Sequence, residues 1–512
     1  MLEIIAGVVA VVVGLVLIFV MFTRRPANAP PNAQLGLPII GNFIEFAKNP
    51  VHFMENCLNK YGKIYTVPMF HKNLTFLLGP EVSAPFFKLS DDFMSQNEVY
   101  SFMTPVFGKG IVYDAEPKRR TQQYQSMAQG LRGNRLRAYI PKIEKETLEY
   151  LSKWGESGEV DILEALSELT ILTSSRCLHG DDVRENLFAD VSRIYHDLDK
   201  GITPISFFFP YAPTEAHRKR DNARKEMVSI FSKIIDARRS ESEEVREART
   251  DILQIFIDFR YKEDGAALTN EEVVGLLIAL LFAGQHTSSI TSTWATMLLV
   301  HNPRCLEKVL AEQRAILGED AAKRPLDYDV VGAMDYLQNC VKESLRLFPP
   351  LIMLMRMAMQ DIPTTLDGKT YIIPKGDIVV ASPAVSSRLP DVFKNPNAFE
   401  PERFDPERNE QGVPYAYLGA LLLIHPLLYA IFIIARPLIV CCIAFSHSST
   451  GFGGGMHQCM GQQFGLLQVK TIVSILLRRY RFEAVDKELP EPDFTAMVVG
   501  PMNHCRVRYT RL

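Results

Sequence analysis

A cysteine in a glycine-rich loop is the residue of this chain best suited to chemistry. Cys459 follows residues 451–455, which contain four glycines, and precedes a stretch of helical hydrophobic periodicity over residues 462–477. The N–H groups of such a loop and the positive end of the following helix would face the sulfur and favour its thiolate form. A thiolate in this position is a nucleophile or a metal ligand, and a buried structural thiol is the alternative.

The same loop excludes two other kinds of site. It lacks the Gly-Lys-Ser/Thr sequence of a phosphate-binding loop. His457 and Cys459 are too close together to form the usual zinc-ligand pair, and no second pair lies nearby in the sequence.

A second group of polar residues interrupts the longest apolar stretch. The capping-box pattern at residues 269–272 and Asn302-Pro303 predict a buried helix about 45 Å long between them. His286 and Thr287 stand in its middle, where polar side chains are costly unless something uses them. The alternative is a helix–helix contact in which Thr287 bonds to its own backbone.

Three charged residues predict a structural lock. Glu343 and Arg346 are three positions apart on a predicted helix that ends at Pro349-Pro350, so they share a face as an ion pair. Arg403, in the segment 399–404, could close the pair into a triad. Removing one member of a buried ionic cluster costs ~3–5 kcal/mol.

Composition limits the class of protein. With 56 basic and 59 acidic residues the net charge is −3, which argues against a nucleic-acid binder. A hydrophobic share of 47% excludes global disorder, and eight cysteines are too few for a disulfide framework in 512 residues. The body is predicted to be mostly helical, with strand-like pieces at 64–67, 75–78, 371–373 and 378–381, and the charged stretch 238–251 to be a solvated helix face or loop.

The first residues predict a membrane anchor. Residues 4–22 carry no charge, which is long enough to span a bilayer as a helix, and Arg24 and Arg25 follow directly. The positive-inside rule then places the N-terminus in the lumen and the body in the cytosol. A cleaved signal peptide is the alternative. The predicted division is an anchor at 1–23, a proline-rich linker at 24–35 and one large domain at 36–512.

Four segments together resemble the cytochrome P-450 (haem-thiolate monooxygenase) family: residues 283–288, Glu343 with Arg346, 399–404 and 452–461. The resemblance implies a single large domain, mainly α with small β-sheets (α+β), that binds haem b through Cys459. It also implies that Thr287 and His286 help to deliver protons to bound dioxygen. Electrons would come from NADPH through a flavoprotein reductase, at the endoplasmic reticulum membrane.

Within this family the sequence is similar to the sterol 14α-demethylases, because His286 stands where most members carry an acid and residues 100–114 resemble their substrate-recognition loop. The similarity implies three oxygenations of one sterol methyl with release of formate, and sensitivity to azole-type inhibitors. It assigns haem propionate contacts to Tyr100, Tyr113, Arg356 and His457, and sterol contacts to Phe102, Met103, Phe107, Ala283, Leu351, Met353 and Met355. The alternatives are another haem-thiolate hydroxylase of lipids and a non-catalytic haem- or sterol-binding membrane protein.

One segment departs from the family pattern. Fifty-four residues separate Phe404 from Cys459, where the family has some twenty, and the surplus falls on residues 420–451. Residues 421–445 carry one formal charge, Arg436, and read alone they would be a second membrane span. Our hypothesis is that the segment is a translated intron or gene-model error, and a lineage-specific insertion is the alternative.

Overall fold

The computed structural model describes residues 25–35, 41–69, 72–186, 188–417, 459–502 and 505–512. The predicted anchor 1–23, the predicted insert 420–451 and His457 lie outside these residues. The chain forms two compact units, Met1–Val99 with Met353–Ser386, and Tyr100–Ile352 with Ser387–Leu512.

The first unit is built on a five-stranded sheet in the order β1-β2-β8-β5-β3, in which β2 and β8 are parallel and the other neighbours antiparallel. The strands are β1 (Ile64–Met69), β2 (Lys72–Leu77), β3 (Met94–Ser95), β5 (Leu354–Ala358) and β8 (Ile378–Ala381), and β6 (Ile362–Leu366) pairs with β7 (Lys369–Ile373) as a hairpin. The helices are α2 (Gly41–Lys48), α3 (Pro50–Tyr61), α4 (Pro80–Lys88) and α20 (Pro383–Ser386), and α5 (Asn97–Tyr100) leads into the second unit. Each of the four predicted strand pieces overlaps one of these strands: 378–381 matches β8 at both ends, and the ends of the other three differ by at most three residues.

The predicted linker is part of the first unit in its described residues. Ala33 is fully buried, its N–H donates to Thr66 of β1 at 2.7 Å, and the N–H of Thr66 donates to Pro31 at 2.9 Å. Arg25 forms an ion pair with Asp377 at 2.5 Å. Residues 25–35 of the predicted linker are therefore held to β1 by backbone hydrogen bonds and to Asp377 by an ion pair.

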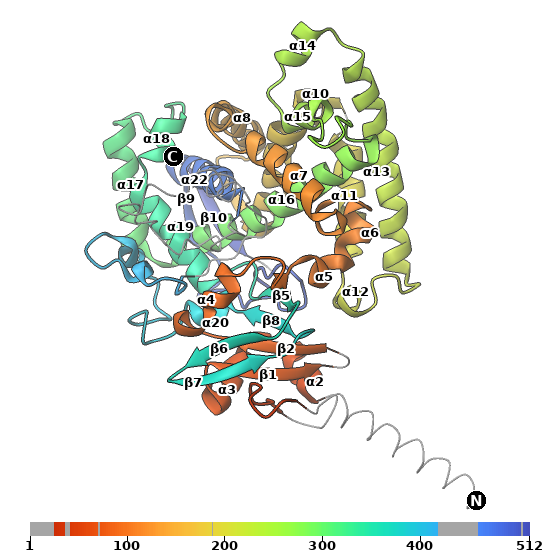
Figure 1. The fold of residues 1–512 in the computed structure, drawn as a ribbon. Helices are drawn as coiled ribbons and strands as arrows, with labels where there is room; N and C mark the ends of the chain where they lie inside the picture. Colours follow the sequence, from red (N-terminus) through yellow and green to blue (C-terminus); the bar gives the residue numbers. More distant parts are fainter. Residues whose placement is uncertain (1–24, 36–40, 70–71, 187, 418–458, 503–504) are drawn as a thin grey trace, which may run out of the picture. The chain divides into compact units, whose positions relative to one another are not determined.

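The second unit is mainly helical and holds one three-stranded sheet, β4 (Ser157–Asp161), β10 (Arg506–Arg511) and β9 (Tyr480–Ala484) in that order (Figure 1). Its longer helices are α7 (Pro117–Gly130), α8 (Asn134–Leu151), α9 (Ile162–Ser174), α11 (Phe188–Lys200), α13 (Glu215–Arg239), α16 (Asn270–His301), α17 (Pro303–Leu317), α19 (Asp335–Leu347) and α22 (Gln462–Arg479). Shorter ones are α6 (Thr104–Phe107), α10 (Asp181–Asn186), α12 (Pro204–Phe208), α14 (Glu243–Glu247), α15 (Ile252–Asp258), α18 (Tyr328–Gly332), the 3-10 helices η1 (Ser101–Met103), η2 (Val112–Asp114), η4 (Pro401–Phe404) and η5 (Glu410–Gly412), and the π-helix η3 (Ser175–His179).

Helix α16 is the central element of the second unit, and its ends are those the sequence predicts. The hydroxyl of Thr269 accepts from the N–H of Glu272 at 3.2 Å, and the Glu272 carboxylate accepts from the N–H of Thr269 at 2.8 Å. Helices α9, α13, α19 and α22 pack around it. Within the described part of the chain α16 alone is long and apolar enough to cross a membrane, and it is mostly buried in protein.

The charged stretch 238–251 is not simply a solvated surface. Arg238 is 1% exposed and forms ion pairs with Asp182 at 2.5 Å and with Asp251 at 2.7 Å. Asp251 is also buried, and its carboxylate accepts a hydrogen bond from the backbone N–H of Gln254 in the first turn of α15. The prediction was therefore wrong at both ends of this stretch, because tertiary ion pairs bury the charges there.

Candidate active site

A cavity of about 310 Å³ lies in the second unit, beside the middle of α16. Nine of the predicted site residues line it: Tyr100, Phe102, Met103, Phe107, Tyr113, Ala283, His286, Thr287 and Leu351. The sequence reasoning missed the other lining residues: Asp199, Lys200, Ile202, Ala279, Phe282, Ala496, Met497 and Val498. The volume is within the usual range for small-molecule sites, roughly 300–1,000 Å³, and most of the lining is apolar.

One wall of the cavity is a cluster of aromatic rings. Tyr100 and Tyr113 stack with ring centroids 5.1 Å apart, and Phe107 packs against Tyr113 at 6.3 Å. Phe282 of α16 meets the edge of Phe107 at 6.2 Å. Burial raises the pKa of Tyr113 well above its usual value, with smaller contributions from Tyr124 and Tyr100. The Tyr113 hydroxyl therefore acts as a neutral hydrogen-bonding group.

Gln123 of α7 holds the backbone that leads to Tyr113. Its side-chain oxygen accepts from the N–H of Val112 at 3.0 Å, and its side-chain nitrogen donates to the carbonyl of Gly110 at 2.8 Å. Val112 has a φ of 49°, which is rare for a β-branched residue and persists only where the surroundings fix it. Gln123 is thus a positioning residue for the aromatic wall.

The polar centre of α16 faces the same cavity. His286 Nε2 donates to Asp199 Oδ1 of α11 at 2.9 Å, and both residues line the cavity. The Thr287 hydroxyl donates to the carbonyl of Ala283 at 2.5 Å, so the backbone bond of the alternative interpretation is present although Thr287 also borders the cavity.

Cys459 lies beside a second, smaller cavity. It is 6% exposed, and this space of about 40 Å³ is also bordered by Gly284, Ser288 and Phe464. Ala283 and Thr287 line both cavities, so the turn of α16 that carries Thr287 separates the space at the sulfur from the larger cavity.

The pKa of the Cys459 thiol is set by two opposing effects. N–H groups of Gly461 and Gln462 lower it, in the predicted direction, but burial outweighs them and raises that pKa to about 12. A thiolate at this site needs a cation at the sulfur.

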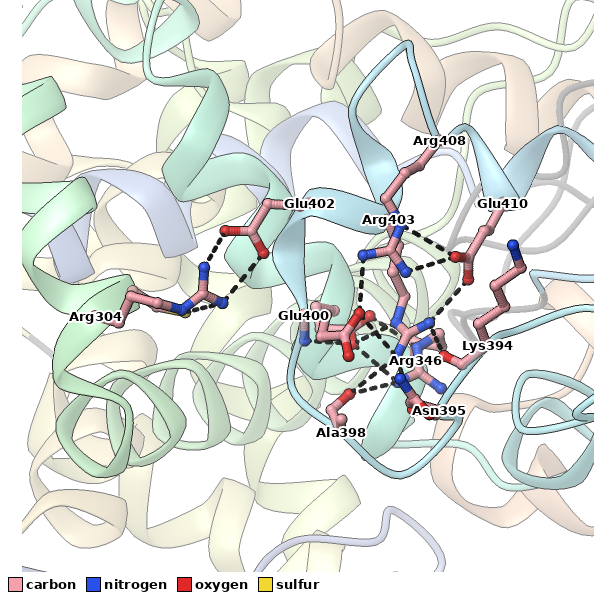
Figure 2. A network of polar contacts seen from close by, with 12 residues as sticks. Arg304, Arg346, Lys394, Asn395, Ala398, Glu400, Glu402, Arg403, Arg408 and Glu410 are labelled. Carbon is pink, nitrogen blue, oxygen red and sulfur yellow. Dashed lines mark hydrogen bonds and ion pairs between the residues drawn. The ribbon is translucent and has the colours of Figure 1, made fainter.

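The predicted triad is present in the second unit, and its three side chains are fully buried. Figure 2 shows Arg346 and Arg403 with the polar groups around them. Arg346 donates to both carboxylate oxygens of Glu343 at 2.7 and 2.8 Å, and Arg403 donates to the same carboxylate at 3.0 Å. Glu410 accepts from Arg403 at 2.8 Å. Because the remaining guanidinium donors reach backbone carbonyls of residues 387–398, the triad ties α19 to the segment that follows α20 in the chain.

The cytochrome P450 family model matches residues 30–420 and 431–505. The chain belongs to the cytochrome P450 family. The break in the match, at residues 421–430, falls inside the predicted insert 420–451.

Relatives cover almost the whole P450 chain. It is 44% identical over 507 residues to a sterol 14-demethylase of Arabidopsis thaliana, with 98% of this chain and 96% of the relative covered. It is 43% identical to an obtusifoliol 14-alpha demethylase of Triticum aestivum, with 94% of this chain and 98% of the relative covered. A solved structure of a retinoic acid-bound cyanobacterial P450 matches the fold with a TM-score of 0.77 at 22% identity, covering 95% of this chain and all of that one.

Membership of the P450 family implies haem with cysteine-ligated iron and the use of dioxygen, and the site fits this group. Among the described residues that border the smaller cavity, Cys459 is the only one with an ionisable side chain. No group of three or more His, Cys, Asp or Glu in the described part of the chain could hold a metal ion. A single strong protein ligand suits an iron whose other ligands come from a macrocycle.

Three further predicted site residues belong to the first unit. Met353 begins its second segment, and Met355 lies on β5 opposite Val380. Arg356, also on β5, is 1% exposed and donates to the carbonyls of Phe86 and Leu89 at 2.7 and 3.1 Å. The propionate and sterol contacts assigned to these residues, and to His457, stay predictions.

Helical periodicity could have found part of what sequence reasoning missed. Ala279 and Phe282 precede Ala283 and His286 by one turn on α16, so they share the cavity face. Asp199 gives no such signal, because its partner is 87 residues away in sequence. Residues 496–498 lie in irregular structure near the C-terminus, and no periodic pattern marks them.

Proposed function

We propose that this P450 removes the 14α-methyl group of a sterol by three successive dioxygen-dependent oxygenations, with release of formate. The observation that carries the proposal is the near full-length identity of 44% to a sterol 14-demethylase. The apolar, aromatic cavity that the predicted recognition residues line supports it as well. Rigid fused rings suit such a wall, because they bury apolar area without losing conformational entropy.

The cavity residues would orient the sterol. Phe102 packs edge-on against Phe207 at 5.6 Å and lines the cavity together with Met103. Leu351 borders the cavity close behind the end of α19. Phe102 resembles the residue of plant-like family members that prefer C4-monomethylated sterols, and the preferred sterol of this chain stays open.

Haem ligated by Cys459 would supply the activation of dioxygen and the oxidation of the methyl group. His286, held by Asp199, and Thr287 would move protons toward the space beside the sulfur, because Thr287 borders both cavities. Tyr100, Tyr113, Arg356 and His457 would bind the haem propionates. Ala283 leaves room for the substrate at the surface of α16.

The setting of the enzyme is part of the proposal. Electrons would reach the haem from NADPH through a membrane flavoprotein reductase. Residues 1–23 would anchor the chain as a single span in the endoplasmic reticulum membrane, with the catalytic domain in the cytosol. Azole-type inhibitors would bind in the cavity that the sterol occupies.

Two optical measurements test the proposal. The reduced carbon-monoxide difference spectrum should show a Soret band at the thiolate position, and sterol addition should shift the Soret band of the oxidised protein. A thiolate band without any sterol response would indicate another lipid hydroxylase. The absence of the thiolate band would contradict the enzyme assignment and favour a non-catalytic binding protein.

A further inference from the structure

The backbone at the end of α6 is confined from two sides. The C-terminal carbonyl groups of a helix need partners outside it, and that of Phe107, the last residue of α6, accepts from Nη2 of Arg224 at 3.4 Å. Arg224 lies on α13, more than a hundred residues further along the chain. Helices α13 and α16 both contact α6.

Two glycines make this close approach possible. A Cβ on Gly108, which has a φ of 109°, would lie 2.1 Å from Nη2 of Arg224. On the α16 side, a Cβ on Gly275 would lie 2.2 Å from the carbonyl oxygen of Phe107 and 2.7 Å from Ile111. The Phe107–Gly108 peptide therefore lies between the Arg224 guanidinium and Gly275 of α16. A methyl group on either glycine would have no room.

Arg224 makes few other interactions. It forms no ion pair within 4 Å in the described part of the chain, and its Nε has no hydrogen-bond partner there. Burial lowers the pKa of its guanidinium, and Glu271 offsets this in part. A half-buried arginine without a salt bridge costs free energy, so its contact with the Phe107–Gly108 backbone is the interaction that accounts for its position.

Phe107, whose backbone lies between Arg224 and Gly275, shapes the substrate cavity. The Phe107 ring lines the cavity and packs against Tyr113 and Phe282. A shift of its backbone would move the aromatic wall as a unit, because close-packed rings transmit displacement.

We propose that Arg224 is a positioning residue for substrate binding: from outside the cavity it holds the Phe107–Gly108 backbone against Gly275 and so sets the position of the aromatic wall. We call this contact of Arg224 and Gly275 with the Phe107–Gly108 backbone the clamp. The identity of the ligand, a sterol, rests on the proposed function, whereas the clamp itself does not.

The test compares Arg224→Met with Arg218→Met in the full-length holoenzyme. Arg218 is an exposed arginine on the same helix, so its replacement controls for the change of charge and helix propensity. Each variant is titrated spectrally with a sterol and with imidazole, which binds iron without filling the cavity. We expect Arg224→Met to raise the sterol dissociation constant about tenfold, with the imidazole constant and the melting temperature unchanged. Arg224→Lys should be intermediate.

A second pair of variants approaches the clamp from the other side. Gly275→Ala should also weaken sterol binding, because its methyl group displaces the Phe107 carbonyl. Gly332→Ala is the control, since a Cβ there meets nothing within 4 Å. Hydrogen exchange supplies a readout that needs no sterol: Arg224→Met should speed exchange over residues 101–114, and Arg218→Met should not.

The outcomes separate the two claims. If the wild-type protein gives no sterol response, the proposed function fails while hydrogen exchange still tests the clamp. The clamp is overturned if exchange over 101–114 is the same in both arginine variants. The positioning role is overturned if the sterol and imidazole constants of Arg224→Met change equally, or if neither changes.

Discussion

At the scale of single residues, the site depends on a few polar groups in an apolar surrounding. His286 has a defined orientation because Asp199 accepts its Nε2 proton at 2.9 Å. The rings of Tyr195 and Phe282 lie 5.9 and 6.4 Å from the imidazole and limit its movement. A histidine held by a carboxylate in this way is oriented for proton transfer.

Replacement of Asp199 by Asn should therefore uncouple oxygen consumption from product formation. The amide cannot stabilise an imidazolium as a carboxylate does, and its NH₂ group favours a different imidazole orientation. We expect the share of electrons released as peroxide to rise severalfold, with haem content unchanged. Asp197→Asn, two residues earlier on α11, is the control and should leave that share as in the wild type.

A buried histidine outside the site predicts a pH dependence of stability. His179 is 2% exposed, packs edge-on against Phe231, and neither ring nitrogen has a hydrogen-bond partner in the described part of the chain. Burial, and then Arg238, lower its pKa from 6.5 to about 4, and Asp182 offsets this in part.

The unfolded chain therefore binds a proton at His179 at a higher pH than the folded chain does. Stability from the neutral ring is fully present above pH 6.5 and is lost as the pH falls toward 4, by about 1.4 kcal/mol per pH unit. His179→Phe should remove this component of the slope in denaturant unfolding between pH 6.5 and 4. Replacement of the exposed His196 by Phe should keep the wild-type slope, and equal slopes in both variants would refute the assignment.

At the scale of elements, the Glu343, Arg346 and Arg403 triad fixes α19 and the segment after it. All three side chains are fully buried. Glu343→Gln leaves the buried Arg346 without its counter-charge and removes one of the carboxylates that pair with Arg403, so the free energy of unfolding should fall by about 3–5 kcal/mol. Denaturant titration of the purified protein measures this change.

A matched carboxylate nearby gives the contrast. Glu402 pairs with Arg304 and Lys308, both at 2.8 Å, and these two cations are about half exposed or more. Because solvent screens such pairs, Glu402→Gln should cost about 1 kcal/mol or less. A loss for Glu343→Gln as small as that for Glu402→Gln would contradict the role of the triad.

How far the elements could be predicted depends on where their determinants lie. The ends of α16 were predicted to within a residue because Thr269 with Glu272 and Asn302-Pro303 encode both ends locally. The pairing of Asp199 with His286 and the burial of Arg238 could not be predicted, because both depend on the packing of distant helices. The N–H donors near Cys459 could be predicted because they follow it directly in the sequence, whereas the burial that raises its pKa depends on packing and could not.

At the scale of the whole molecule, the sequence has two long apolar segments near its first residues and before Cys459, and we interpret them differently. Residues 4–22 carry no charge, and we predict that they form a single membrane span. Residues 420–451 interrupt the chain shortly before Cys459, where the family match also breaks. An exposed apolar segment of this length would favour aggregation.

Peptide mapping of the native protein tests the hypothesis about residues 420–451. We expect no peptide from 421–436, and a peptide that joins residues near 419 directly to those near 452. Recovery of peptides from within 421–436 would show that the segment is translated and retained.

The central claim is the removal of the 14α-methyl group of a sterol at Cys459-bound haem. Its most direct test is incubation of the protein, a flavoprotein reductase and NADPH with a sterol labelled in that methyl group. The account predicts labelled formate equimolar with the demethylated sterol, and none from Cys459→Ser. A hydroxylated product that keeps the labelled methyl group, or formate release that persists in Cys459→Ser, would contradict it.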